Sequence, residues 1–219
     1  LDILAGELRR LHGISMTSAH VGSLAGLIAL ARGEADVAGC HLLDEETGEY
    51  NVPFVKRLLP GEEILLVNLA YRVQGLMIPP GNPKEVQGLR DLARPDVTMV
   101  NRQRGSGTRV LLDHSLRQEG IPPDSIRGYH HEVTTHLGVA SAIAGGSADV
   151  GLGILAAARA LGLDFLPLAR ERYDLAIPQA HLESAPIRHM LEVIRGEHFR
   201  TLVKSLGGYE TEETGQVMT

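Results

Sequence analysis

Apolar residues recur at helical spacing along much of the chain, and short β-branched runs lie between them. The spacing predicts helices at 1–12, 23–32, 85–93, 107–119, 135–145, 155–161 and 185–206, the last broken near Gly196. Strands are predicted at 14–18, 36–41, 64–69, 73–78, 97–101, 126–131, 149–153 and 164–168. We also expect an irregular section at 44–61, an extended return at 173–178 and a frayed end at 210–219. This alternation indicates an α/β fold in which helices flank a mostly parallel sheet.

One pattern occurs twice. Residues 30–39 and 143–153 each pass from the end of an amphipathic helix, through a glycine turn, to a strand that opens on Ala-Asp-Val. A polar run precedes each helix, at 18–23 and at 131–136. Because free backbone N–H groups collect at helix N-termini, such runs favour small anionic or polar ligands. The repeat predicts one βαβ-type unit used in each of two lobes.

Two segments are candidates for the crossings between these lobes. Three prolines in Pro79–Pro83 fit neither a helix nor a central strand. The extended stretch at 173–178 provides the return. We therefore expect lobe I at 1–80 plus 176–219 and lobe II at 81–175, closing on a ligand by a hinge motion.

Composition removes several functions. The net charge of −6, the absence of tryptophan and the aromatic content of 4% disfavour nucleic acid, which calls for a basic face and stacking side chains. The one cysteine, Cys40, permits no internal disulfide, and its apolar neighbours predict a buried strand thiol. No apolar run approaches the ~20 residues of a membrane span. A cytoplasmic location is the default expectation.

The segment 101–109 holds the densest set of candidate binding groups. It leaves a β-branched strand and enters a helix through two glycines, with hydroxyl residues suited to an N-cap. The alternative interpretation is a tight strand-to-helix turn with solvated arginines; the combination of caps, glycines and arginines favours a ligand loop. The candidate ligand-binding residues here are Arg102, Gly105, Ser106, Gly107, Thr108 and Arg109.

The polar runs before the two repeated helices supply the other candidates, which are Ser18, His20, Ser23, Thr134, Thr135 and His136. Each run also has a plain structural interpretation. Ser23 would then cap its helix and His20 would be an exposed loop residue, with the same ambiguity for the second run.

Other chemistries find less support. Gly151–Ala156 fits a loose dinucleotide pattern, but no acidic residue ends the following strand. His130 and His131 point to opposite faces of a predicted strand, and the remaining histidines have no i, i+4 partner, so no metal site is expected. Asp36 and Asp149 fit turn chemistry. No nucleophile elbow or Cys/His arrangement is evident. These observations favour a binding domain over an enzyme and leave the question of catalysis open.

Five stretches carry a resemblance to a known family: 20–23, 33–44, 47–51, 101–109 and 171–175. In combination they resemble the periplasmic-binding-protein-like domain found at the C-terminus of MoeA-type molybdopterin biosynthesis proteins and fused to helix-turn-helix regulators. The resemblance implies a two-lobed type II solute-binding fold, shared with tungstate and molybdate receptors and LysR-type effector domains. In tungstate receptors, hydroxyl-bearing loops at helix N-termini hold the oxyanion; Ser23 and Ser106–Thr108 match them. A preceding strand, with a further Ser or Thr in its loop, is expected before Leu1.

We therefore expect a non-catalytic domain that binds a small oxyanion, molybdate or tungstate first and a pterin-linked metabolite second, with no required cofactor. Two alternatives stay open. The chain could be part of a molybdopterin biosynthesis enzyme that grips a pterin phosphate, or the effector-sensing domain of a transcriptional regulator. An upstream fused domain of either type is compatible with the sequence, no membrane or nucleic-acid partner is expected, and the oligomeric state stays open.

Overall fold

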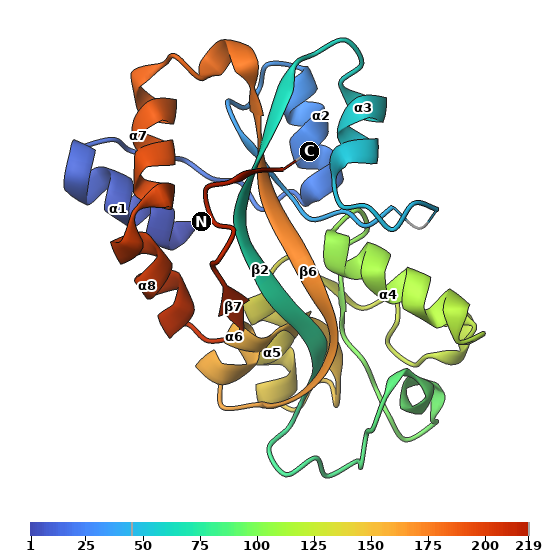
Figure 1. The fold of residues 1–219 in the computed structure, drawn as a ribbon. Helices are drawn as coiled ribbons and strands as arrows, with labels where there is room; N and C mark the ends of the chain where they lie inside the picture. The colour runs from blue at the N-terminus through green and yellow to red at the C-terminus, as the bar shows by residue number, and fades with distance from the viewer. Residues whose placement is uncertain (45, 219) are drawn as a thin grey trace. The chain divides into compact units, whose positions relative to one another are not determined.

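The computed structural model describes residues 1–44 and 46–218, and the chain divides into two compact units (Figure 1). Unit 1 contains Leu1–Tyr71 and Arg172–Thr219, and unit 2 contains Arg72–Glu171. Both boundaries fall inside long strands, β2 (Ile64–Ile78) and β6 (Asp164–Pro178). The expected α/β architecture of two units is confirmed.

The α-helices are α1 (Asp2–His12), α2 (Ser23–Ala31), α3 (Val52–Leu58), α4 (Gly107–Gln118), α5 (His136–Ala144), α6 (Leu155–Ala160), α7 (Ala185–Arg195) and α8 (Glu197–Ser205). The short strands are β1 (Ala38–Cys40), β3 (Asn101–Arg102), β4 (Glu132–Val133), β5 (Gly151–Ile154), β7 (Tyr209–Glu210) and β8 (Val217–Met218). Single 3₁₀ turns occur at Leu89–Ala93, Pro123–Ser125 and Gln179–His181. Among the described helices, none has the length and apolar character that a bilayer crossing requires.

The sheets are mixed in direction. The larger sheet has the strand order β1-β6-β2-β5, and β7 and β8 also pair with β2. β1 runs antiparallel to β6, β5 runs antiparallel to β2, and the small β3–β4 pair is parallel. Antiparallel pairing arises here because β2 and β6 each continue for 15 residues instead of ending at a crossover helix.

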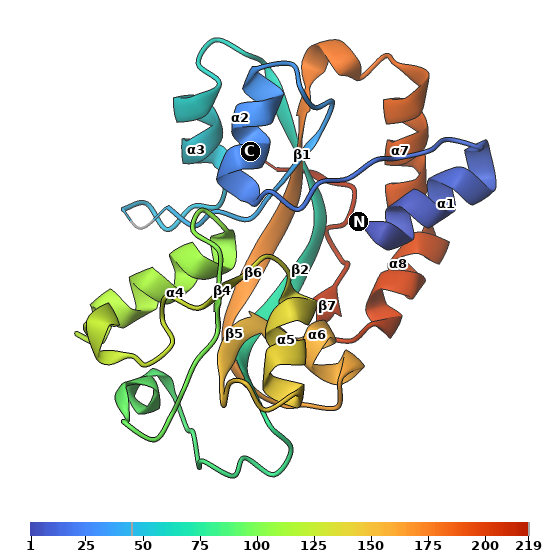
Figure 2. The same cartoon turned by 180° about the vertical axis from the view of Figure 1, so that it is seen from behind.

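The repeated sequence pattern forms the same local structure twice, once in each unit. In unit 1, α2 packs on β1, the strand that follows it, and in unit 2, α5 packs on β5 (Figure 2). The glycine turns predicted between helix and strand are present, with Gly33 and Gly146 at positive φ. The prediction of a duplicated helix–turn–strand unit is confirmed.

Helices α1, α7 and α8 form one apolar layer of unit 1 (Figure 1). On α7, the buried residues Ile187, Met190, Leu191 and Ile194 recur at the spacing of a single helix face. The predicted break near Gly196 is confirmed, since α7 ends at Arg195 and α8 begins at Glu197. Truncating a fully buried residue such as Ile194 to alanine would cost about 2–5 kcal/mol.

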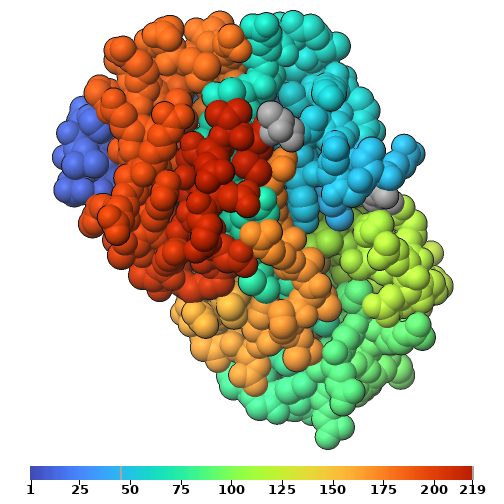
Figure 3. Space-filling model, viewed as in Figure 1, coloured from blue at the N-terminus to red at the C-terminus, as the bar shows by residue number. Residues whose placement is uncertain are grey.

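The C-terminal segment is ordered, so the expectation of a frayed end at 210–219 is wrong for its described residues. β8 pairs with β2 through Leu66 and Val67. The buried Thr214 donates its hydroxyl to the Leu69 carbonyl at 2.9 Å. In Figure 3 this red segment lies beside the orange helices of unit 1. The polar composition of this segment gives no sequence signal for its order, because the order comes from backbone pairing.

The core of unit 2 surrounds the C-terminal part of β2 and the strand β5. Leu76, Met99, Leu112 and Val150 are fully buried in it. The predicted strands at 97–101 and 126–131 are mostly irregular, and regular pairing is limited to β3 and β4. The segment at 85–93 forms a short 3₁₀ turn at its end instead of an α-helix.

Two further expectations for unit 1 differ from the structure. Residues 14–18 form no strand, although Ile14 and Met16 pack against the core of unit 1; their alternation reflects that packing and not sheet pairing. The section at 44–61, expected to be irregular, contains α3. Residue 45 lies outside the described residues.

The unit boundaries lie at 71/72 and 171/172, where the sequence predicts 80/81 and 175/176. The proline-rich segment 79–83 lies within unit 2 and forms a turn there. The Gly81 N–H donates to the Asp164 carboxylate at 2.8 Å, and the Asn82 side chain bonds both backbone groups of Val86. The prolines thus end β2, and the crossings are made by continuous strands.

Candidate functional site

A cluster of charged and amide side chains is buried in unit 2. Arg72 and Gln74 are two residues apart on β2, so they leave the same face of the strand. Glu171 on β6 accepts from both of them. Arg72 Nε donates to one carboxylate oxygen, and Gln74 Nε2 donates to the other at 2.7 Å. All three residues are less than a tenth exposed.

The N-terminus of α4 adjoins this cluster through Thr108. Gln74 Nε2 donates a second hydrogen bond to Thr108 Oγ1 at 3.1 Å. Ser106 caps the helix, since its hydroxyl accepts from the Arg109 N–H at 3.2 Å, and Gly105 makes the preceding turn at φ +82°. Gly107 is the first helical residue and is buried. The loop is therefore both a capped turn and the segment that carries Thr108 to the charged cluster.

Arg102 adds a second guanidinium to this region. Its Nη2 donates to the Thr134 carbonyl at 2.9 Å, and its Nε donates to Gln103 Oε1 at 3.1 Å. Desolvation by burial, followed by the charge of Arg72, lowers the pKa of Arg102 to about 10, while the charge of Glu171 raises it. The guanidinium remains protonated at neutral pH, so a second buried cation lies near the Arg72–Glu171 pair.

The orientation of the Gln74 amide follows from this chemistry. Glu171 is paired with Arg72, and an ionised carboxylate only accepts hydrogen bonds, so the amide nitrogen must face it. The Gln74 carbonyl oxygen, Oε1, then points elsewhere. It is buried, and no donor within the described residues reaches it. Leaving a buried acceptor without a hydrogen bond costs about 1–3 kcal/mol of stability relative to a satisfied one.

Arg109 is engaged in contacts within unit 2. Its Nε donates to both carboxylate oxygens of Asp113 at 3.0 and 3.1 Å, and its Nη1 donates to Glu132 at 2.9 Å. The guanidinium also stacks over the Tyr129 ring at 4.2 Å. Arg109 therefore helps to hold α4 against β4, and its role as a ligand contact stays a prediction.

The second polar run of unit 2 has a mainly structural role. Thr135 caps α5, since its hydroxyl accepts from the Gly138 N–H at 2.9 Å. The Thr134 side chain is exposed, and its backbone carbonyl accepts from Arg102. His136 begins α5 and is half-buried. This run therefore joins the cluster through a backbone oxygen and not through its hydroxyls.

The corresponding run in unit 1 is more open. Ser18 and His20 are exposed in the irregular segment before α2. Ser23 is buried and begins α2, but Gly22 occupies the cap position, and the Ser23 hydroxyl accepts from the His41 N–H at 3.3 Å. The alternative in which Ser23 caps its helix is wrong, because its oxygen is turned toward the segment after β1.

A different polar network, which the sequence did not reveal, is buried in unit 1. Asp174 accepts from Asn51 at 2.8 Å, from Asn68 at 3.1 Å and from Arg172 at 2.8 Å. Arg172 also donates to the Tyr50 carbonyl at 2.7 Å. Burial raises the pKa of Asp174, and the hydrogen bonds and the positive charge of its partners lower it in part. The only signal for this network was a carboxylate two residues from an arginine on one strand face.

The remaining candidates have packing explanations. A Cβ at Gly151 would lie 2.4 Å from a Val139 methyl group, and one at Gly153 would lie 2.4 Å from the Met77 methyl group. These glycines therefore permit close packing of β5, which removes the main support for a dinucleotide site. Cys40 is buried, and burial raises the pKa of its thiol, as expected for an inert strand cysteine.

A family model of the PBP superfamily domain matches residues 5–195. The chain belongs to the PBP superfamily. This membership agrees with the part of the sequence resemblance that concerns the fold. The two units, each with helices packed on a mixed sheet, are the architecture of that superfamily as the matched solved structures show it.

Three proteins that match this chain differ widely in their sequence identity to it. The chain is 39% identical over 218 residues, all but one of its own, to the uncharacterized protein YvgK of Bacillus subtilis, of which it covers 70%. It shares its fold with a phosphate ABC transporter substrate-binding protein of Clostridium perfringens solved with bound phosphate, at a TM-score of 0.67, 14% identity, and coverage of 94% of this chain and 91% of that one. It also matches PEB3 bound to L-phospholactate, at a TM-score of 0.62, 15% identity, and coverage of 95% and 93%.

Proposed function

We propose that this PBP-superfamily domain binds a small oxyanion, and that the unit 2 cluster at the N-terminus of α4 supplies a main part of its site. The observation that carries the proposal is the imbalance of buried charge. Arg72 and Arg102 are 6% and 7% exposed; Arg72 donates to the Glu171 carboxylate, whereas the Arg102 guanidinium donates to the Thr134 carbonyl and to the Gln103 amide.

Electrostatics explains why this imbalance favours an anion. A buried cation without a full counter-charge is costly, and each charge-assisted hydrogen bond to a guanidinium contributes about 1.5–3 kcal/mol. The N-terminal end of α4 adds about 0.3–1 kcal/mol for a negative charge. Two guanidiniums and one helix end together approach the roughly 8 kcal/mol that a complex in the micromolar range requires.

The buried Gln74 Oε1 supports a particular kind of oxyanion. An acceptor without a donor is satisfied by a ligand that carries its own O–H group. Hydrogen phosphate carries one at neutral pH, whereas sulfate, molybdate and tungstate are fully deprotonated. Relatives of the same fold that hold phosphate and L-phospholactate agree with this preference. We therefore rank phosphate above molybdate or tungstate, the ligands that the MoeA-type resemblance implies.

Isothermal titration of the chain with phosphate, sulfate, molybdate and tungstate tests the proposal. We expect phosphate to bind at micromolar strength and sulfate, the matched anion without a proton, to bind at least about tenfold more weakly, a difference of about 1.4 kcal/mol. Tighter binding of molybdate or tungstate than of phosphate would keep the oxyanion site but overturn the role of Gln74. No binding of any of the four anions would overturn the proposed function.

A further inference from the structure

Helices α1 and α7 bring three metal-ligating side chains together in unit 1, apart from the anion cluster. One atom each from His12, His189 and Glu192 lies within 4.8 Å of the other two. His189 and Glu192 are three residues apart on α7 and therefore share one face of the helix. His12 is the last residue of α1, which packs against α7. The sequence could not show this grouping because it joins two helices that are distant along the chain.

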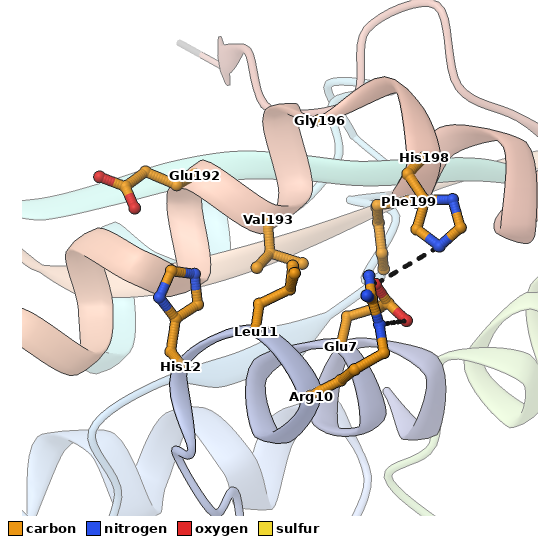
Figure 4. Close-up of a pocket in the computed structure, with 9 residues that line it drawn as sticks. All are labelled: Glu7, Arg10, Leu11, His12, Glu192, Val193, Gly196, His198 and Phe199. Atoms are coloured by element: carbon orange, nitrogen blue, oxygen red, sulfur yellow. Dashed lines mark hydrogen bonds and ion pairs between the residues drawn. The ribbon is translucent and has the colours of Figure 1, made fainter.

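The two imidazole rings are stacked, with centroids 4.0 Å apart and planes inclined by 23°. His189 Nδ1 lies 3.0 Å from a carboxylate oxygen of Glu192. Figure 4 places His12 on the side of α7 that carries Glu192.

We propose that His12, His189 and Glu192 bind a divalent late transition-metal ion of the Zn²⁺ class. Zn²⁺ takes imidazole nitrogens at about 2.0–2.1 Å and carboxylate oxygens at about 2.0–2.2 Å, which places tetrahedral ligand atoms about 3.4 Å apart. The His189 and Glu192 side chains are 37% and 64% exposed, so small rotations can bring the ligand atoms to that spacing. Water completes the fourth position. Bound metal would tie the end of α1 to α7.

Neighbouring side chains provide an internal control. A shallow cavity of about 260 Å³ adjoins His12, and His198 lies on its wall together with Phe199 (Figure 4). His198 contacts Glu7 at 3.5 Å, and Glu7 also pairs with Arg10. His198 therefore belongs to a separate ion-pair group, and its removal leaves the proposed three ligands intact.

The test is competition for Zn²⁺ between the full chain and a chromophoric chelator at neutral pH. We expect one tight site in the wild type, an affinity at least about tenfold lower in His12→Ala and in His189→Ala, and a smaller loss in Glu192→Gln. His198→Ala, a nearby histidine, and His131→Ala, an exposed histidine of unit 2, should match the wild type. Binding should also weaken as the pH falls through the range in which imidazole is protonated.

Two readouts separate a site from incidental binding. Co²⁺ added to the wild type should give the visible absorption of a tetrahedral ion, which His12→Ala/His189→Ala should lose while its circular dichroism spectrum is unchanged. Wild-type affinity in this double variant would overturn the proposal. Equal loss in His131→Ala would overturn it too, because the metal would then be spread over surface histidines. Neither outcome bears on anion binding by unit 2.

Discussion

The two units each bury a polar cluster on the shared strands β2 and β6, and the clusters differ in charge balance. In unit 1 one carboxylate, Asp174, faces one guanidinium, Arg172. In unit 2 the Arg72–Glu171 pair has a second guanidinium, Arg102, close enough for the charges of both partners to shift its pKa. Because Glu171 and Arg172 are adjacent on β6, a single strand contributes to both clusters.

On this difference we propose a structural role for the unit 1 network and a binding role for the unit 2 cluster. The carboxylate in unit 1 has amide and guanidinium donors on both oxygens, so it has little to gain from a ligand. Each cluster also holds one buried amide oxygen that no donor of the described residues reaches, Asn68 Oδ1 in unit 1 and Gln74 Oε1 in unit 2. Polar burial and an unpaired acceptor therefore do not distinguish the clusters. The distinction lies in the charge, because unit 2 buries the additional guanidinium of Arg102.

The largest expected effect is on stability, from the balanced cluster. Asp174→Ala removes the acceptor of three donors and leaves Arg172 without its carboxylate, which should cost about 3–5 kcal/mol in the free energy of unfolding. Urea denaturation measures this loss. The matched control is Asp96→Ala, which breaks an exposed pair with Arg94 and should leave the free energy of unfolding close to that of the wild type. Equal losses in the two variants would contradict a special role for Asp174.

The next effect sharpens the contrast in unit 2. Glu171→Gln should cost roughly 3 kcal/mol, because it removes the carboxylate that accepts from the buried Arg72 and leaves the charge of nearby Arg102 less compensated. Added phosphate should then restore part of the lost stability, whereas it should not rescue Asp174→Ala. Thermal unfolding with and without phosphate measures both. A variant Glu171→Gln that phosphate leaves unstable would show that no anion reaches the cluster.

A smaller effect is expected at the helix end. Thr108→Val keeps the side-chain shape but removes the acceptor for Gln74, so it should cost about 0.5–1.5 kcal/mol. Thr134→Val is the matched control; its side chain is exposed, and the change should stay within about 0.5 kcal/mol. Both values come from chemical denaturation. The link between α4 and the cluster would lose its support if the two substitutions were equivalent.

The smallest effect is the pH dependence of the unit 1 network. Burial raises the pKa of Asp174 above its ordinary value of 3.8, so the folded chain holds this proton to higher pH than the unfolded chain. The contribution to stability is complete below 3.8 and is lost as the pH rises through the raised pKa. The stability of the wild type relative to Asp174→Asn should therefore fall between that value and neutral pH. A rise in this relative stability between pH 3.8 and neutral pH would contradict the upward shift of the Asp174 pKa.

Much of the fold was predictable where the signal is local. The spans of α4 and α5, and the break between α7 and α8, follow from apolar periodicity and from caps or glycines at their ends. The long strands were not predictable as single elements. Arg72 interrupts the apolar pattern of β2 between the predicted strands 64–69 and 73–78, although its side chain is buried.

The same reasoning explains which site residues were missed. Arg102, Ser106 and Thr108 stand close together in the sequence and were found from their loop. Gln74 and Glu171 are separated from their partners by 34 and 97 residues, and no local pattern links them. Arg109 is predicted as a ligand contact from its loop, and the sequence gives no sign of its bonds to Asp113 and Glu132. The sequence signal for the missed residues was Arg72, a charged residue inside the otherwise apolar strand β2.

The central claim is that excess buried positive charge in unit 2 makes an anion site, and titration of phosphate into two variants of one loop tests it most directly. Arg102→Gln removes a buried guanidinium, and Arg104→Gln makes the same change at a side chain that is 77% exposed. We predict that Arg102→Gln weakens phosphate binding at least about tenfold, or about 1.4 kcal/mol, while Arg104→Gln stays within about twofold of the wild type. Unchanged affinity in Arg102→Gln, or equal losses in both variants, would contradict the account.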